Sequence, residues 1–135
     1  MKRFLLLFLL LPVFAFAAPD KYVLPSRAAF KSFELNLHLE PSYELLQPTQ
    51  SFIKVSDADG RVLAQAKVRS LKTKLVWKET PRGKVFIQAK IYFCRHTAQG
   101  LCLVKDFRFE VPVKGKAQKG PLKLELRLPN DHRRT

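Results

Sequence analysis

The two cysteines of this chain lie in one stretch, residues 91–113, and they constrain the fold more than any other feature of the sequence. Apolar residues alternate with polar ones before Cys94 and again after Cys102, which predicts two β-strands. The seven residues between the cysteines are mostly small or polar and include Gly100, a composition typical of a turn. The stretch therefore predicts a β-hairpin with one cysteine near each end of its loop.

The start of the chain has the pattern of a cleaved export signal. Lys2 and Arg3 precede an apolar run that closes on a small-x-small triplet. This run is shorter than the roughly 20 residues needed to cross a bilayer, and Pro12 interrupts it, so stable membrane insertion is the weaker interpretation. We expect residues 1–17 to be removed and residues 18–135 to form a single soluble domain, periplasmic or secreted.

Export also bears on the state of the cysteines. In an oxidising compartment an even number of cysteines is more often paired than free, and two cysteines allow only one connectivity. We therefore expect a disulfide between Cys94 and Cys102. A disulfide that closes so short a loop would stabilise the fold by about 2.5 kcal/mol, which is reason enough for a small exported domain to keep it.

Four stretches alternate apolar and polar residues with the period of two that buries one face of a strand. The predicted buried rows are Phe33, Leu35, Leu37 and Leu39; Val85, Ile87, Ala89, Ile91 and Phe93; Phe107, Phe109, Val111 and Val113; and Leu122, Leu124, Leu126 and Leu128. By the same count Cys94 and Cys102 fall on the opposite face of their strands. There the thiolate of another protein could reach them.

Turn signals separate these rows. Residues 57–60 and 79–83 are predicted to close hairpins, because glycine supplies the positive φ that tight turns need. Residues 43–48 should form a short connection and residues 114–120 a basic loop. With six to eight short strands, no convincing amphipathic helix and no internal repeat, the sequence predicts an all-β fold, an antiparallel β-sandwich of immunoglobulin type.

The chain is strongly basic, with a formal charge of +14 that falls to +12 once Lys2 and Arg3 leave with the signal. Such a charge favours an acidic partner, but a solvated surface that keeps an exported domain soluble explains it equally well. The candidate contact row for an acidic partner consists of Lys72, Lys74, Lys78, Lys84 and Lys90. Nucleic acid is not expected, because Phe107 and Phe109 belong to a predicted core row and few aromatic residues remain for base stacking.

Three segments of the sequence resemble a known family. They are Tyr92-Phe93-Cys94, Gly100-Leu101-Cys102, and residues 33–55 with Tyr43 after a proline-containing turn. The chain resembles the N-terminal immunoglobulin-like domain of the thiol:disulfide interchange protein DsbD, and is equally similar to the C-terminal β-domain of NHL-repeat thioredoxin-like proteins. The resemblance implies that Cys94 and Cys102 form a reversible disulfide, supported by Tyr92, that exchanges electrons with a thioredoxin-fold or other redox protein.

Two interpretations of the cysteine pair remain open from the residues alone. Arg95 and His96 follow Cys94, and Lys105 lies near Cys102; cations at these positions would stabilise a thiolate, which favours a redox role. The alternative is a non-catalytic basic binding module in which the hairpin disulfide is purely structural.

Other chemistries have weaker support in the sequence. A metal site built from Cys94, His96 and Cys102 with His38 or His132 matches no usual zinc spacing and needs reduced thiols, so neither a metal nor another cofactor is expected. The chain has no G-x-S-x-G motif and no carboxylate pair with evident partners, so a hydrolase is not expected. If the domain is an enzyme, thiol:disulfide interchange is its reaction.

Overall fold

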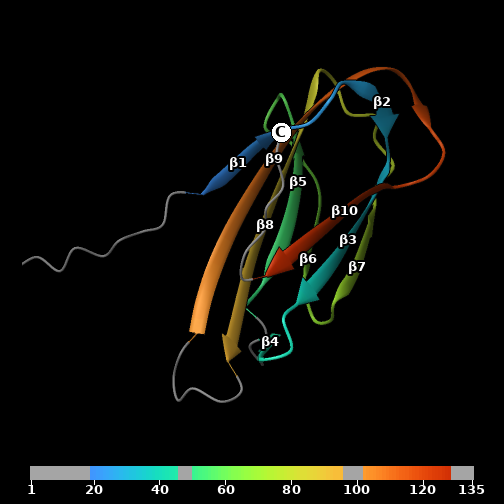
Figure 1. Cartoon of the computed structure of the whole chain (residues 1–135). Coiled ribbons are helices and arrows are strands. Elements are labelled where there is room, and N and C mark those ends of the chain that lie inside the picture. Colours follow the sequence, from blue (N-terminus) through green and yellow to red (C-terminus); the bar gives the residue numbers. More distant parts are fainter. Residues whose placement is uncertain (1–18, 46–49, 96–101, 129–135) are drawn as a thin grey trace, which may run out of the picture.

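The computed structural model describes residues 19–45, 50–95 and 102–128, and these residues form ten β-strands and no helix. The strands are β1 (Asp20–Val23), β2 (Arg27–Phe30), β3 (Ser32–Leu39), β4 (Tyr43–Leu45), β5 (Phe52–Asp57), β6 (Val62–Lys67), β7 (Lys72–Val76), β8 (Lys84–Arg95), β9 (Cys102–Gln118) and β10 (Leu122–Leu128). They lie in two sheets packed against each other, as Figure 1 shows. The predicted all-β sandwich is confirmed.

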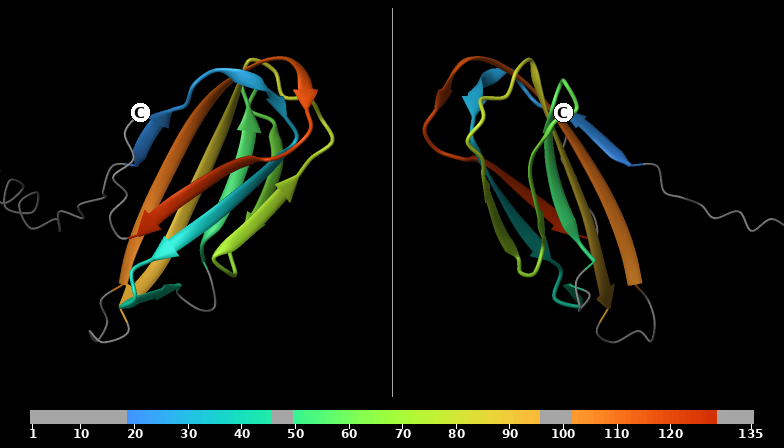
Figure 2. Two further views of the ribbon diagram at one scale, coloured as in Figure 1. Left: turned by 45° about the vertical axis from the view of Figure 1, so that its right-hand side comes forward. Right: turned by 180° about the vertical axis from the view of Figure 1, so that it is seen from behind.

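Two sheets of unequal size make the sandwich. The larger sheet has the order β1-β9-β8-β5-β6, with β2 also paired to β9 and β4 to β8, and the smaller sheet has the order β10-β3-β7. Figure 2 shows the two sheets from both sides, with the long strands β8 and β9 adjacent throughout. The facing sides bury an apolar core, and its largest side chains include Phe30, Phe33, Phe93, Phe107 and Phe109.

The β8–β9 hairpin keeps one register from the pair Lys84–Pro112 to the pair Cys94–Cys102. No shift interrupts this ladder, so the alternation of side chains between the two faces continues along both strands. Every predicted core residue of these two strands is buried, as predicted from the period of two. Both cysteines lie on the opposite face, also as predicted.

The leucine rows of β3 and β10 form the inner face of the smaller sheet. The two strands pair in parallel, from Leu122 opposite Phe33 to Leu128 opposite Leu39, and all of these rows are buried except Leu39, which is half-buried. Strands β1 and β2 also run parallel to β9. The sheets are therefore mixed, and the prediction of a purely antiparallel sandwich was wrong on this point. Alternation shows which face a side chain takes, but it is the same for either direction of the neighbouring strand.

Three segments differ from their predicted form. Residues 79–83 do not close a hairpin, since they link β7 in the smaller sheet to β8 in the larger one. Residues 43–45 form β4, and residues 114–118 extend β9, where part of the segment pairs with β2. Backbone pairing holds these short segments, and Lys114 and Lys116 are exposed, so no apolar period reveals them. The described chain accordingly has more strands than the six to eight predicted.

The predicted turn at residues 57–60 is confirmed, and Asp57 organises it. The carboxylate is buried, and Oδ1 accepts hydrogen bonds from the backbone N–H groups of Asp59 (3.0 Å) and Arg61 (3.1 Å). Oδ2 accepts two more from the Arg61 guanidinium, at 2.8 and 3.0 Å. Gly60 follows with φ +82°, a conformation that other residues rarely adopt.

We expect Asp57 to make the fold acid-sensitive. Burial raises the pKa of Asp57, but its hydrogen bonds with Arg61 outweigh burial and hold the pKa below its ordinary value. A group whose pKa is lower in the folded state contributes stability above its unfolded pKa and loses it as the pH falls through the folded value. Asp57→Asn should therefore lower the melting temperature by several degrees at neutral pH and flatten the loss of stability below about pH 4.

Thermal unfolding of the native protein and of Asp57→Asn across this pH range measures the effect. The matched control is Asp59→Asn, two residues along the same turn, because the Asp59 side chain is exposed. Parallel pH profiles for the native protein and Asp57→Asn would contradict the assignment.

Candidate redox site on the β8–β9 hairpin

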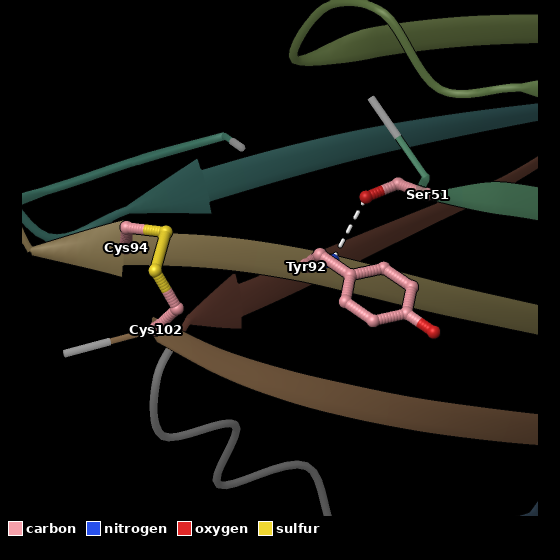
Figure 3. The surroundings of a disulfide bond; sticks show 4 residues. All are labelled: Ser51, Tyr92, Cys94 and Cys102. Atoms are coloured by element: carbon pink, nitrogen blue, oxygen red, sulfur yellow. Dashed lines mark hydrogen bonds between the residues drawn. A yellow bond between two sulfur atoms is a disulfide. The ribbon is translucent and has the colours of Figure 1, made fainter. Parts of the chain in front are cut away.

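The disulfide closes the loop end of the β8–β9 hairpin. Cys94 and Cys102 are direct cross-strand partners and form the last pair of the ladder, with their Cα atoms 4.0 Å apart. Figure 3 shows the bond spanning from β8 to β9 where the paired strands end. The disulfide predicted from export and the even number of cysteines is therefore present in the fold.

Both cysteines lie outside the core, but they differ in exposure. Cys102 is exposed and Cys94 is half-buried on the outer face of the larger sheet, in rows that also contain Tyr92 and Val104. A disulfide on an outer face can be reached by the thiolate of another protein, whereas a core disulfide cannot. Cys102 is the more accessible member of the pair.

A buried hydroxyl and an aromatic contact in the core hold the backbone next to Cys94 in place. Ser51, the residue before β5, is fully buried, and its hydroxyl accepts a hydrogen bond of 2.8 Å from the N–H of Tyr92 (Figure 3). Phe93 is buried in the core, and the ring of Tyr43 packs edge-on against it at a centroid distance of 5.5 Å. Sequence reasoning missed Ser51, because 41 residues separate it from Tyr92 and no pattern links the two.

Two of the three cations predicted around the cysteines, Arg95 and Lys105, do not share their face. The Arg95 guanidinium lies 5.6 Å from the ring centre of Tyr43, on the core-facing side of β8. Lys105 is half-buried opposite the core residue Ile91, so it also lies on the inner side. His96 lies outside the described residues.

A carboxylate lies on the sulfur face instead. Glu44 of β4 is the direct cross-strand partner of Cys94, and paired residues project to the same face of a sheet. Sequence reasoning missed this neighbour, because residues 43–48 are predicted to be a connection rather than a strand. A thiolate at Cys94 would lie beside this negative charge, whereas Cys102 is one strand further away.

The five lysines of the predicted contact row lie on different parts of the sandwich. Lys72 and Lys74 are on β7 in the smaller sheet, and their Nζ atoms lie 3.6 and 3.7 Å from the carboxylate of Glu34. A hydrogen bond from Asn36 holds the pKa of Glu34 below its ordinary value; burial raises it, and the nearby lysines add to the lowering. Lys78 is in the connection that follows β7.

The other two lysines of that row lie on the larger sheet, on the face that carries the disulfide. Lys84 forms a 3.5 Å ion pair with Glu110, and the Lys90 ammonium lies 5.8 Å from the ring centre of Tyr92. The outer faces of the two sheets of a sandwich point in opposite directions. The structure therefore joins Lys84 and Lys90 with the cysteines, and separates them from Lys72 and Lys74.

Further cations gather on the outer face of the larger sheet. A hollow of about 390 Å³ is lined there by Lys21, Lys54, Phe86, Arg108 and Glu110, among other residues. Sequence reasoning did not select Lys21 or Lys54, because they meet only through the pairing of β1 with β9 and of β5 with β8. The hollow lies toward the opposite end of β8 from the disulfide.

The metal site considered from the sequence has no counterpart within the described residues, where no group of three or more His, Cys, Asp or Glu side chains could hold an ion. His38 lies in the smaller sheet, 3.4 Å from Glu125, and His96 and His132 are outside the described ranges. Residues 19–45, 50–95 and 102–128 also include no helix with the length and apolar character of a membrane span. The predicted signal lies outside these residues.

Comparison with known proteins adds no family to these observations. No protein-family model matches the chain, and no curated protein matches it significantly. The resemblance to the N-terminal domain of DsbD remains a prediction from the residues quoted above.

Proposed function

We propose that this protein is an exported thiol–disulfide exchange domain that uses the Cys94–Cys102 disulfide to relay electrons with a thioredoxin-fold partner. The observation that carries the proposal is the placement of the disulfide, at the loop end of the longest hairpin and on its outer face, with Cys102 exposed. A disulfide with only a structural role does not need to be accessible to the thiolate of another protein. The resemblance at Tyr92, Cys94 and Cys102 supplies the type of reaction.

The exchange takes two steps. A thiolate of the partner attacks one sulfur of the disulfide, forms a mixed disulfide with it and releases the other cysteine as a thiolate. The second thiol of the partner loses its proton, attacks the mixed disulfide at the partner's own sulfur and frees the first cysteine. Cys94 and Cys102 each take up a proton and become thiols, while the partner becomes a disulfide, so two electrons have moved. The reverse sequence passes the electrons on.

The surroundings favour attack at Cys102. Its side chain is the more exposed of the two, whereas Cys94 is half-buried between β9 and β4, with Glu44 opposite. An incoming thiolate is repelled by a carboxylate, so the path to Cys94 is electrostatically less favourable. The thiolate released by attack at Cys102 is then that of Cys94.

The reduction potential of the Cys94–Cys102 pair tests the proposal. Structural disulfides in secreted proteins usually have potentials below about −300 mV, so we expect a value above that limit. Equilibration with glutathione or dithiothreitol over a series of ratios, followed by alkylation of free thiols and mass analysis, gives the value. A potential well below the limit would leave the disulfide with a structural role.

The hollow that contains Lys21 and Lys54 favours a second candidate function, a basic module that binds an acidic protein. The side chain of Phe86 offers an apolar contact within this cationic surface. Binding by such a surface should weaken steeply as salt rises, and should be the same whether Cys94 and Cys102 are oxidised or reduced. An interaction that depends on the cysteines would indicate the redox function instead.

A further inference from the structure

The part of β9 that carries Cys102 has a partner strand on one side only. Strand β8 pairs with β9 from Cys102 to Pro112, whereas on the other side β1 begins at Phe107 and β2 at Val113. Among the described residues, no strand lies beside residues 102–106 on that side. Figures 1 and 2 show this part of β9 as the outer edge of the sheet, below β1.

The main-chain groups of Cys102 and Val104 point to this open side. The carbonyl of Glu110 accepts a 2.9 Å hydrogen bond from the N–H of Leu24, just beyond β1, so the groups of Glu110 face away from β8. Main-chain groups alternate in direction along a strand, and the β8–β9 register has no shift between Glu110 and Cys102. Every second residue back from Glu110, including Val104 and Cys102, therefore faces the open side.

The chemistry of disulfide exchange requires attack from this same side. The incoming sulfur, the attacked sulfur and the leaving sulfur lie nearly in line during exchange. The disulfide spans from β8 to β9, so a thiolate that attacks Cys102 must approach from beyond β9, over the open edge. An attack on Cys94 would have to come from the side of β4, where Glu44 lies.

The side chains along the open edge select the kind of segment that can pair there. Cys102 and Val104 give the first part of the outer face of the edge an uncharged surface, and neither residue blocks pairing as proline would. Asp106 follows on the same face, where its carboxylate lies 3.3 Å from the Arg108 guanidinium. Lys105 lies on the inner face, and its charge disfavours pairing with the same edge of a second copy of this basic chain. A segment with an acidic side chain opposite Lys105 is favoured instead.

We propose that the open edge of β9, residues 102–106, binds as an added strand an extended segment that lies next to the reactive thiol of the redox partner. Main-chain hydrogen bonds to Cys102 and Val104 hold the segment, and an acidic side chain of the partner meets Lys105. The partner's thiolate is then positioned in line with the disulfide, which raises the rate of attack at Cys102. This inference rests on the proposed function and adds how the partner is recognised.

The first test removes one main-chain donor from the edge. Val104→Pro deletes the N–H that faces the open side and keeps the β8 ladder, because proline is tolerated at edge positions whose N–H is unpaired. Val104→Ala is the matched control, since it shortens the side chain and keeps the N–H. With reduced thioredoxin as the probe, we expect Val104→Pro to slow reduction of the disulfide about tenfold or more and Val104→Ala to change it less than about twofold. Reduction by dithiothreitol, which needs no strand, should be equal in all three proteins.

Two results separate failure of this inference from failure of the proposed function. Rapid exchange with thioredoxin at the same rate in Val104→Pro and Val104→Ala would overturn the added strand and leave the redox function standing. Absence of exchange in the native protein, together with a reduction potential in the range of structural disulfides, would overturn both.

Amide hydrogen exchange gives an independent test without a proline. In a mixed disulfide between the Cys94→Ser variant and thioredoxin lacking its second cysteine, the amide of Val104 should exchange at least tenfold more slowly than in the same variant joined to glutathione. The amide of Leu103, which faces β8, should be the same in both. Equal exchange at Val104 in the two adducts would contradict the added strand.

Discussion

Replacing Cys94 with serine is expected to yield a protein that captures its redox partner in a mixed disulfide, whereas replacing Cys102 should nearly abolish capture. Both variants lose the disulfide and retain one thiol, so they differ only in which cysteine remains. Cys102 is exposed at an open sheet edge, and Cys94 is half-buried opposite Glu44. Each variant is first converted to the mixed disulfide of its one cysteine with thionitrobenzoate, and reduced thioredoxin that lacks its second cysteine then attacks this sulfur and releases thionitrobenzoate. We expect at least a tenfold difference in the yield of trapped complex on non-reducing gels.

Stability cannot account for such a difference, because the two variants lose the same covalent constraint. Closing this short loop is worth about 2.5 kcal/mol, and both variants should be less stable by a similar amount. Urea unfolding of each variant checks this point. Equal capture by the two variants, or better capture by Cys102→Ser, would show that access does not select the attacked sulfur.

The sequence predicted the parts of this fold that depend on side-chain alternation. The rows from Val85 to Phe93 and from Phe107 to Val113 are buried as expected, and the same count placed both cysteines on the outer face. This inference succeeded because the β8–β9 ladder has no bulge between Lys84 and Cys94. One shifted residue would have moved a cysteine into the core.

The partners of each strand were harder to predict, and the surroundings of the disulfide depend on them. Glu44 lies opposite Cys94 only because β4 pairs with the end of β8, and Ser51 supports Tyr92 only because β5 begins beside it. Such long-range pairing leaves no periodic trace in either segment. Arg95 was predicted to stabilise a thiolate because it follows Cys94 in the sequence. Neighbouring residues of a strand point to opposite faces, so Arg95 lies on the face of β8 away from the sulfur.

Strand pairing also decides which lysines lie together, so the basic residues in the sequence did not reveal a binding surface. Lysines close in sequence can lie in different sheets, since Lys74 is on β7 in the smaller sheet and Lys84 is on β8 in the larger one. Lys21 and Lys54 are far apart in sequence but line one hollow. A surface of this kind is defined by sheet order, which the charge pattern does not encode.

Replacing Phe93 with alanine is expected to cost about 3–5 kcal/mol of unfolding free energy. The Phe93 side chain is fully buried, lies between Tyr92 and Cys94 in sequence, and packs against the ring of Tyr43 that covers the end of the core. A small domain has about 5–15 kcal/mol of stability in total, so this single change should remove about a fifth of it or more. Urea unfolding monitored by circular dichroism measures the loss.

Phe86→Ala is the matched control for this prediction. It makes the same substitution on the same strand, but Phe86 lies on the outer face and is 38% exposed. Its removal leaves no closed cavity, so we expect a loss of less than about 1.5 kcal/mol. Because Phe93 holds the end of β8 against the core, its loss should also speed alkylation of the reduced cysteines, and Phe86→Ala should not. Similar losses of stability from the two variants would mean that β8 does not turn its Phe93 row to the core, and would remove the basis for placing Cys94 and Cys102 on the outer face.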